Sequence, residues 1–236
     1  MIKAVLKSKR MILGFSLAFI LAELCLSVAV HTVGGRTNDF ISVGAIALCC
    51  LFSLLFFKKE KDYALVQTAL FCTVMADVCL LILQPRNQLL AMLFFSVTQI
   101  CYFLRIYITE KRLRKAHIIL RISVTLAALA ATVVVLKDKT DPLSLVSLFY
   151  FANLGINMLW AFFDFKTSRL FAVGLLLFLL CDVCIGLSVM SEAYIPVSKG
   201  SFIYHIIHPG FNLAWCFYIP AQVLIVLSLA EKRLKR

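Results

Sequence analysis

Long apolar runs, each close to the length of a bilayer core, recur from one end of the chain to the other and constrain its fold more than any other feature. A helix needs about 20 apolar residues to cross the hydrocarbon, and it satisfies its own backbone hydrogen bonds where no water is present. The sequence therefore predicts an all-α integral membrane bundle of eight transmembrane helices, folded as a single domain over residues 1–236. The predicted spans are Met11–Val33, Phe40–Phe57, Tyr63–Leu83, Gln88–Thr109, Ala116–Leu136, Pro142–Phe163, Ser168–Met190 and Phe211–Ala230.

Composition excludes an ordinary soluble domain. Hydrophobic residues make up 62% of the chain and charged residues only 15%, well below the share usual in soluble proteins. The first run follows basic residues, as a signal peptide does, but it is longer than a signal and seven more runs follow. We therefore expect a retained first span and a multi-pass protein of the cell membrane.

The net charge of +12 indicates topology, and we expect no nucleic-acid partner. When the amino terminus is placed in the cytoplasm, most Lys and Arg side chains fall on the inner side, as the positive-inside rule requires. Both termini are then cytoplasmic, and contact with anionic lipid is expected. The inner set is Lys3, Lys7, Lys9, Arg10, Lys58, Lys59, Lys61, Lys111, Arg112, Arg114, Lys115, Lys166, Arg169, Lys232, Arg233, Lys235 and Arg236, against Arg36, Arg86, Lys137, Lys139 and Lys199 outside.

Two carboxyl groups lie inside apolar runs: Asp77 in "MADVCLLIL" and Asp182 in "LCDVCIGLSVM". An ionisable residue in mid-span costs about 2.5–3.5 kcal/mol on insertion scales. Arg105 and Arg121 lie near the inner ends of their runs and are expected to extend to the headgroups, which leaves the acids without a cation. At least one acid should then be protonated near neutral pH. Such a pair suits acid–base catalysis, a proton-coupled carrier, or a structural hydrogen-bonded pair.

The two Asp-Val-Cys runs are the third and the seventh, and the runs after them also correspond. "FFSVTQ" (Phe94–Gln99) and "FYIPAQ" (Phe217–Gln222) each read Phe, aromatic, three residues, Gln. Parallel repeats of this kind occur in membrane folds. We predict a 4+4 parallel repeat with halves 1–110 and 111–236.

Polar side chains in several runs recur at helical spacing, so they share a face that should point away from lipid. Counting residues from the outer ends places Glu23, Gln99 and Gln222 in the same outer-half layer as the two acids. Interhelical hydrogen bonding is the ordinary explanation for such amides, and a polar chamber is the functional one. The residues expected to face it are Glu23, Gln99, Tyr102, Asn153, Asn157, Tyr218 and Gln222.

Motifs for other chemistries are absent from the sequence, and we expect no metal and no cofactor. The chain has no phosphate-binding glycine loop, no G-x-S-x-G and no H-E-x-x-H, which disfavours a serine-nucleophile lipase. His31, His205 and His208 fall toward the outer face, where interfacial histidines are ordinary. All nine cysteines lie inside predicted spans, where we expect them to act as small apolar residues.

Four segments resemble the YhhN-like, lysoplasmalogenase family. They are "ADVCLLILQPRNQLLAMLFFSVTQICYFLRIY", "LLLFLLCDVCIGLSVM", "FYIPAQVLIVLSL" and, more loosely, "YFANLGINMLW". The resemblance implies an eight-span hydrolase that cleaves the vinyl ether of lysoplasmalogens without a metal and releases a fatty aldehyde and a glycerophospho-base. It implies that Asp77 and Asp182 are catalytic and that the substrate is a lysophospholipid.

Two residues depart from the family pattern: Ala76 stands for a Gly, and Gln99 for a frequent His. Glutamine cannot carry a proton near neutral pH, whereas histidine can. This substitution leaves open a slow, altered or inactive enzyme. Two other functions therefore stay open: a proton-coupled carrier of a small amphiphile, and a non-catalytic lipid-binding membrane protein.

Overall fold

The computed structural model describes residues 2–57, 62–109, 114–137, 140–163, 165, 168–193, 198, 200–201, 204 and 211–235. Within these residues the protein is helical and contains no strand. Its elements are α1 (Ile2–Thr32), α2 (Arg36–Phe56), α3 (Tyr63–Asp77), η1 (Val78–Ile82), α4 (Gln88–Thr109), α5 (Arg114–Leu136), α6 (Pro142–Phe163), α7 (Arg169–Ala193) and α9 (Leu213–Lys235).

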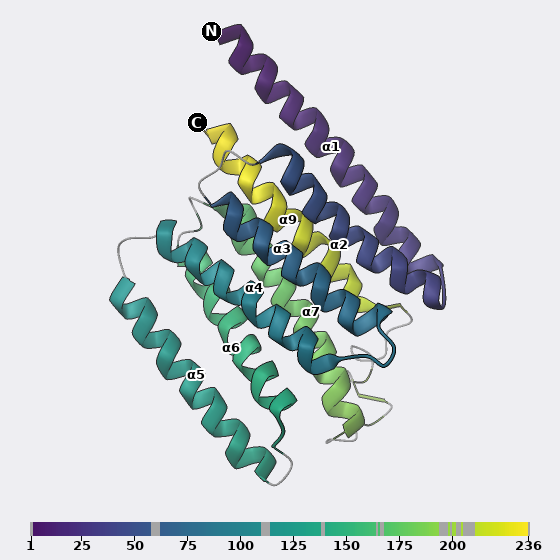
Figure 1. Ribbon diagram of the computed structural model, residues 1–236, viewed down its shortest axis with the longest axis vertical. Coiled ribbons are helices and arrows are strands. Elements are labelled where there is room, and N and C mark those ends of the chain that lie inside the picture. Colours follow the sequence, from purple (N-terminus) through teal and green to yellow (C-terminus); the bar gives the residue numbers. More distant parts are fainter. Residues whose placement is uncertain are drawn as a thin grey trace.

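The described helices confirm the predicted all-α membrane bundle, because eight of them are long and apolar enough to span a bilayer. Figure 1 shows α1 and α5 at opposite edges of the bundle, and it places the start of α1 and the end of α9 at the same end. We call this the terminal end of the bundle. Which side of the membrane it faces, the internal repeat and the single domain remain predictions.

Burial is uneven across the bundle and follows this arrangement. The span in α9 is the most buried, and it packs against α1, α2, α3 and α7. The span in α5 is the least buried, and large apolar side chains such as Ile119 and Leu126 are exposed along it. Exposed apolar surface of this kind suits lipid, which satisfies no polar group.

Close packing of α7 against α9 depends on Gly174. A Cβ atom at this position would lie 2.9 Å from Ile225 Cγ1 and 3.0 Å from the carbonyl oxygen of Ala221. Small residues let membrane helices approach closely where no hydrophobic effect drives them together. This contact sets the position of α9, which carries Tyr218 and Gln222.

The apolar run to Leu83 had predicted one regular helix for the third span, whereas the structure shows a change of helix type within it. α3 ends at Asp77 and continues as the π-helical turn η1. There the Leu83 amide donates to the Val78 carbonyl oxygen at 3.0 Å, and the Asn87 amide donates to Cys79 at 3.1 Å. Hydropathy does not distinguish α from π turns, which explains the difference. Single π turns occur often at functional sites, and this one directly follows Asp77.

The start of α6 is fixed by a local cap. Asp141 Oδ1 accepts a hydrogen bond from the Ser144 amide at 2.8 Å, and Ser144 Oγ donates to the Asp141 carbonyl oxygen at 2.8 Å. Pro142 occupies the first helical position, where its missing N–H costs nothing. The hydrogen bond from the Ser144 backbone, helped by its side chain, holds the pKa of Asp141 below its ordinary value.

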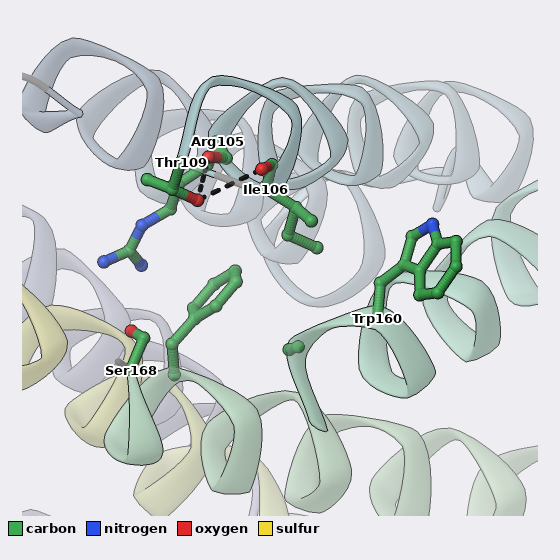
Figure 2. Close-up of a pocket in the computed structure, with 7 residues that line it drawn as sticks. Arg105, Ile106, Thr109, Trp160 and Ser168 are labelled. Atoms are coloured by element: carbon green, nitrogen blue, oxygen red, sulfur yellow. Dashed lines mark hydrogen bonds between the residues drawn. The ribbon is translucent and has the colours of Figure 1, made fainter. Parts of the chain in front are cut away.

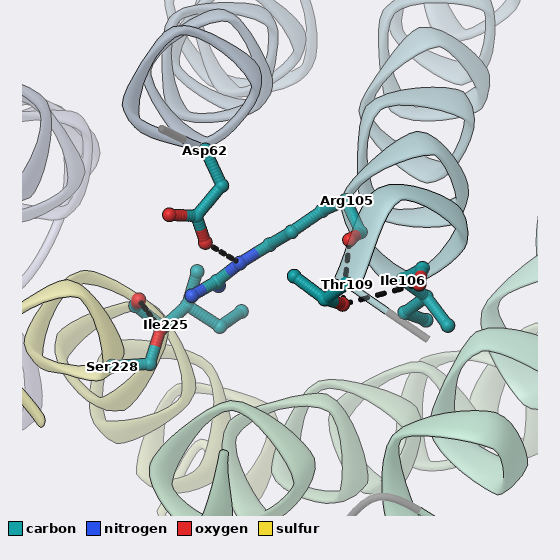
Figure 3. Close-up of polar contacts among 6 residues, drawn as sticks. All are labelled: Asp62, Arg105, Ile106, Thr109, Ile225 and Ser228. Carbon is teal, nitrogen blue, oxygen red and sulfur yellow. Dashed lines mark hydrogen bonds and ion pairs between the residues drawn. The ribbon is translucent and has the colours of Figure 1, made fainter. Parts of the chain in front are cut away.

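An ion pair lies inside the bundle near its terminal end. Arg105 Nε donates to Asp62 Oδ2 at 2.7 Å, and Arg105 is only 1% exposed. Figure 3 shows Asp62 reaching Arg105 from the start of α3, with Thr109 and Ser228 nearby. The expectation that Arg105 extends to the headgroups is therefore wrong. A carboxylate within reach holds the guanidinium in the interior, where leaving either charge unpaired is costly.

Candidate functional site

Asp77 forms the first of two acid–tyrosine pairs in the interior. The Tyr218 hydroxyl donates to Asp77 Oδ1 at 3.0 Å and to Oδ2 at 2.9 Å. Asp77 is the last residue of α3 and only 4% exposed, and Tyr218 lies on α9. The pair therefore joins residues from the third and the last spans.

Asp182 forms the second pair with a tyrosine from a different helix. The Tyr150 hydroxyl, on α6, donates a hydrogen bond to Asp182 Oδ2, on α7. Tyr150 shares a helix face with Asn153 and Asn157, which the sequence predicted to face a polar chamber. Its role as partner of an acid was not predicted, because spacing within one helix does not identify the neighbouring helix.

The two pairs are neighbours. The carboxyl groups of Asp77 and Asp182 are close enough to interact electrostatically. The fully buried ring of Phe178, one turn before Asp182, lies between the two tyrosines, with its centroid 5.4 Å from Tyr218 and 6.4 Å from Tyr150. The structure thus brings two acids and two phenols from four helices, α3, α6, α7 and α9, into one cluster. We call Asp77, Asp182, Tyr150 and Tyr218 the acid cluster.

No cation pairs with either acid among the residues that the structure describes, where the one ion pair is that of Arg105 with Asp62. Within the described residues, the acids accept hydrogen bonds from tyrosine hydroxyls and interact electrostatically with each other. Where two carboxyl groups interact strongly, they titrate as a pair and share a proton. A pair of this kind can donate one proton and accept another.

Arg121 lies inside the bundle, contrary to the expectation that it extends to the inner headgroups. Its Nη1 donates to Asn153 Oδ1, and its Nη2 donates to Asn157 Oδ1 at 2.5 Å. Nη2 also lies 3.3 Å from His117 Nε2, one turn earlier on α5. The guanidinium reaches two amide oxygens on α6 because α5 packs directly against α6.

Gln99 belongs to the same group of side chains. Asn157 Nδ2 donates to the Gln99 backbone oxygen at 2.9 Å and to Gln99 Oε1 at 3.0 Å. We call Arg121, Asn153, Asn157, Gln99 and His117 the arginine network. Three of these residues were predicted to face a chamber, whereas His117 was not named. Its position four residues before Arg121 on one helix face was the sequence signal that could have identified it.

Glu23 was expected in one layer with the acids, but its partner is elsewhere. It is 2% exposed, and its Oε1 accepts a hydrogen bond from the Cys49 thiol at 3.4 Å, between α1 and α2. No hydrogen bond joins it to Asp77 or Asp182 in the part of the chain that the structure describes. Equal depth on two helices does not make neighbours, because α1 lies at the edge of the bundle (Figure 1).

Tyr102 and Gln222 are fully buried and carry polar atoms with no hydrogen-bond partner in the structure, as does Gln99 Nε2. The Tyr102 ring packs on Phe171 with centroids 5.5 Å apart, and Gln222 lies one turn after Tyr218 on α9. A buried polar atom without a partner costs about 1–3 kcal/mol. Unpaired atoms of this kind are where water or a ligand is expected.

A small pocket lies at the terminal end, away from the acid cluster. Figure 2 shows its lining, with the Arg105 guanidinium on one side near Ser168 and Trp160 on the other. Its volume of about 20 Å³ suffices for about one water molecule. This pocket has donors for such a water, because three buried atoms have no hydrogen-bond partner in the described part of the chain: Arg105 Nη1, Arg105 Nη2 and Ser168 Oγ.

No three His, Cys, Asp or Glu side chains converge on a possible metal position among the described residues. His31 lies 3.3 Å, through Nε2, from Cys216 Sγ. The other two outer-face histidines named above, His205 and His208, are outside the described residues.

A family model described as the YhhN family matches residues 46–229, a range that includes all of the acid cluster and the arginine network. No curated protein matched the chain, and no solved structure did.

Proposed function

Since the chain belongs to the YhhN family, we propose that it is a membrane hydrolase that cleaves the vinyl ether bond of a lysolipid, with Asp77 and Asp182 as its acid–base pair. The observation that carries the proposal is the acid cluster. Two carboxyl groups from α3 and α7 interact in the interior, each with a tyrosine hydroxyl and neither with a cation among the described residues. A single acid bonded to a tyrosine suffices for a structural role. Two neighbouring acids, in contrast, supply both a proton donor and a proton acceptor.

The reaction needs both. One acid transfers its proton to the vinyl carbon remote from the ether oxygen, which converts the C=C bond into a C–H bond and leaves an oxocarbenium ion. Water adds to that ion while the other carboxylate takes one of its protons. The resulting hemiacetal loses the glycerol oxygen as an alcohol, giving the fatty aldehyde and the glycerophospho-base. One water is consumed, and the two acids together neither gain nor lose a proton.

The hydrogen bonds favour one assignment of the two roles. Tyr218 donates to both oxygens of Asp77, a pattern that suits an ionised carboxylate because it accepts on both atoms. Tyr150 donates to Asp182 Oδ2 alone, which leaves Oδ1 to carry a proton. We assign Asp182 as the proton donor and Asp77 as the base. General acid–base groups typically contribute about 10²–10⁴-fold in rate.

The remaining polar residues have supporting roles in this proposal. Gln222, one turn from Tyr218, and Tyr102 offer unpaired buried polar atoms for water or substrate. Gln99 is held by Asn157, so it positions neighbours and does not shuttle protons. The acids and their tyrosines then carry the proton transfer without the histidine that is frequent at this position. Glu23 is bonded to Cys49 and is assigned no step.

The test is aldehyde release from a lysoplasmalogen by the purified protein in detergent. We expect wild-type activity, and a loss of about 10²-fold or more in Asp77→Asn and in Asp182→Asn. Asp141→Asn is the matched control, because Asp141 is exposed outside the interior and asparagine also caps helices. Full activity in both interior variants would remove these acids from the mechanism. No aldehyde, with pH-driven uptake of an amphiphile into proteoliposomes, would favour the carrier instead.

A further inference from the structure

Arg121 is a cation inside a membrane span whose partners are all neutral. It contacts two asparagine oxygens and a histidine nitrogen, and its guanidinium lies 4.2 Å from the ring centroid of Phe103. No carboxylate pairs with it in the described part of the chain. Arginine remains charged in proteins, and a charge within the bilayer costs several kcal/mol when it is not compensated. The arginine network therefore lacks an anion.

From this we infer that the arginine network binds the phosphate of the lysolipid headgroup. The inference rests on the proposed function, because it names where that substrate is held. A role as a cross-link between α5 and α6 does not explain the residue type. A glutamine donates to the same asparagines without bringing a charge into the membrane.

Arg121 still has donors for an anion. A guanidinium carries five N–H groups, and three go to Asn153, Asn157 and His117. The Nε donor is buried and has no hydrogen-bond partner among the described residues, and Nη1 keeps a second N–H. Arginine is the usual residue for phosphate because its planar fork matches two phosphate oxygens. The two asparagines hold the fork in place before any ligand arrives.

The spacing to the acid cluster agrees with a phosphate at this point. Tyr150, the partner of Asp182, precedes Asn153 by three residues and Asn157 by seven on the same helix, roughly 4.5 and 10 Å along its axis. In a lysolipid only the glycerol unit separates the ether oxygen from the phosphate. A phosphate on Arg121 would therefore bring the ether bond toward Asp182 and Asp77.

The same geometry gives the ligand a direction. From Tyr150 to Asn157, α6 runs toward the terminal end, where Trp160 packs edge-on against His117 with centroids 4.8 Å apart and also lines the pocket beside Arg105. The headgroup would thus point to the terminal end and the hydrocarbon chain the other way. A lysolipid in the leaflet on that side already has this orientation.

Binding of uncleavable probes tests the inference separately from catalysis. A 1-O-alkyl lysophospholipid has no vinyl group to protonate, and the corresponding 1-O-alkylglycerol lacks the phosphate as well. For the wild-type protein in detergent, we expect the alkyl lysophospholipid to bind at least tenfold more tightly than the alkylglycerol. Arg121→Gln should remove this preference by weakening only the lysophospholipid. Arg121→Lys should keep part of it, because a point charge remains without the fork.

Arg169→Gln is the matched control, since it removes one exposed cation outside the network and should preserve the preference. Equal affinity of wild-type protein for the two probes would overturn the inference, and that result needs no variant to fold. An equal loss for both probes in Arg121→Gln would show a structural role and would also overturn it. Inorganic phosphate that competes with neither probe would show that the lipid, not free phosphate, is the ligand. Because no probe is cleaved, absence of aldehyde release contradicts only the proposed function.

Discussion

The hydroxyl of Tyr218 donates to both carboxyl oxygens of Asp77, at 3.0 and 2.9 Å, and so joins the last span to the end of the third. In the aligned hexapeptides of α4 and α9, the residue matching Tyr218 is Phe95, which has no hydroxyl. The Phe95 ring instead packs 5.4 Å, between centroids, from Tyr150, which bonds Asp182. The two acids therefore have the same kind of partner, supplied from non-equivalent helices.

Removal of the Tyr218 hydroxyl should impair catalysis more than folding. In Tyr218→Phe we expect aldehyde release to fall by about 10- to 100-fold, because a hydrogen bond to a charged group is worth about 1.5–3 kcal/mol. Thermal unfolding in detergent should change little, since the ring still packs on Phe178. Tyr63→Phe is the control, because Tyr63 lies fourteen residues before Asp77 on α3, roughly 21 Å away. Equal losses in both variants would contradict a specific role for Tyr218.

Any side chain at Gly174 should separate α7 from α9. In Gly174→Ala the new Cβ would meet Ile225 Cγ1 at 2.9 Å and the Ala221 carbonyl oxygen at 3.0 Å, and overpacking of this kind costs about 1–3 kcal/mol. We expect a lower unfolding temperature and reduced activity, because α9 carries Tyr218. Gly186→Ala in the same helix meets no atom within 4 Å and should be neutral or stabilising. A Gly174→Ala protein as stable as wild type would show that the helices adjust without cost.

The buried ion pair near the terminal end should be sensitive to loss of one partner. Asp62→Asn leaves Arg105 charged and 1% exposed, and breaking a buried pair from one side costs about 3–5 kcal/mol. The double variant Asp62→Asn/Arg105→Gln should recover part of that stability, because no lone charge remains. The measurement is a double-mutant cycle of unfolding free energies in detergent. Strictly additive effects would argue against coupling between the two side chains.

The cap at the start of α6 should weaken in acid. Hydrogen bonds from Ser144 hold the pKa of Asp141 below its ordinary value, so the folded state favours the carboxylate. The stabilisation is present above the unfolded pKa, near 4, and is lost as pH falls through the lower folded pKa. Hydrogen exchange of the Ser144 amide, corrected for its intrinsic pH dependence, should lose protection over that range. Asp141→Asn should show no such pH dependence; if it behaves as wild type does, another group is responsible.

The number and extent of the apolar helices could be predicted from the sequence. Each of the eight apolar runs lies in a helix that is long and apolar enough to span a bilayer, because a bilayer sets the length of a span and hydropathy is a property of consecutive residues. The presence of Asp77 and Asp182 within two spans was equally plain. The ends of spans were less so: the third continues beyond Asp77 as the π turn η1, which depends on local hydrogen bonds that hydropathy does not record.

The side-chain partners of polar residues could not be predicted from the sequence, as three residues show. Glu23 was expected in one layer with the acids, but it accepts a hydrogen bond from Cys49. Arg105 was expected among headgroups, yet it pairs with Asp62, 43 residues away in sequence. Arg121 turns inward to two asparagines on α6. In each case the partner depended on which helix stands beside the residue, and that is set by the tertiary packing.

The sequence by itself determined a bundle of eight membrane helices with a carboxyl group within each of two spans, because the length and polarity of a segment are local properties. Only the tertiary structure decided that these acids meet each other and two tyrosines, and that Arg121 stands apart from them among amides. The rotation of each helix and the choice of its neighbours come from packing all helices together, at contacts such as Gly174 against Ile225. No single segment contains that information.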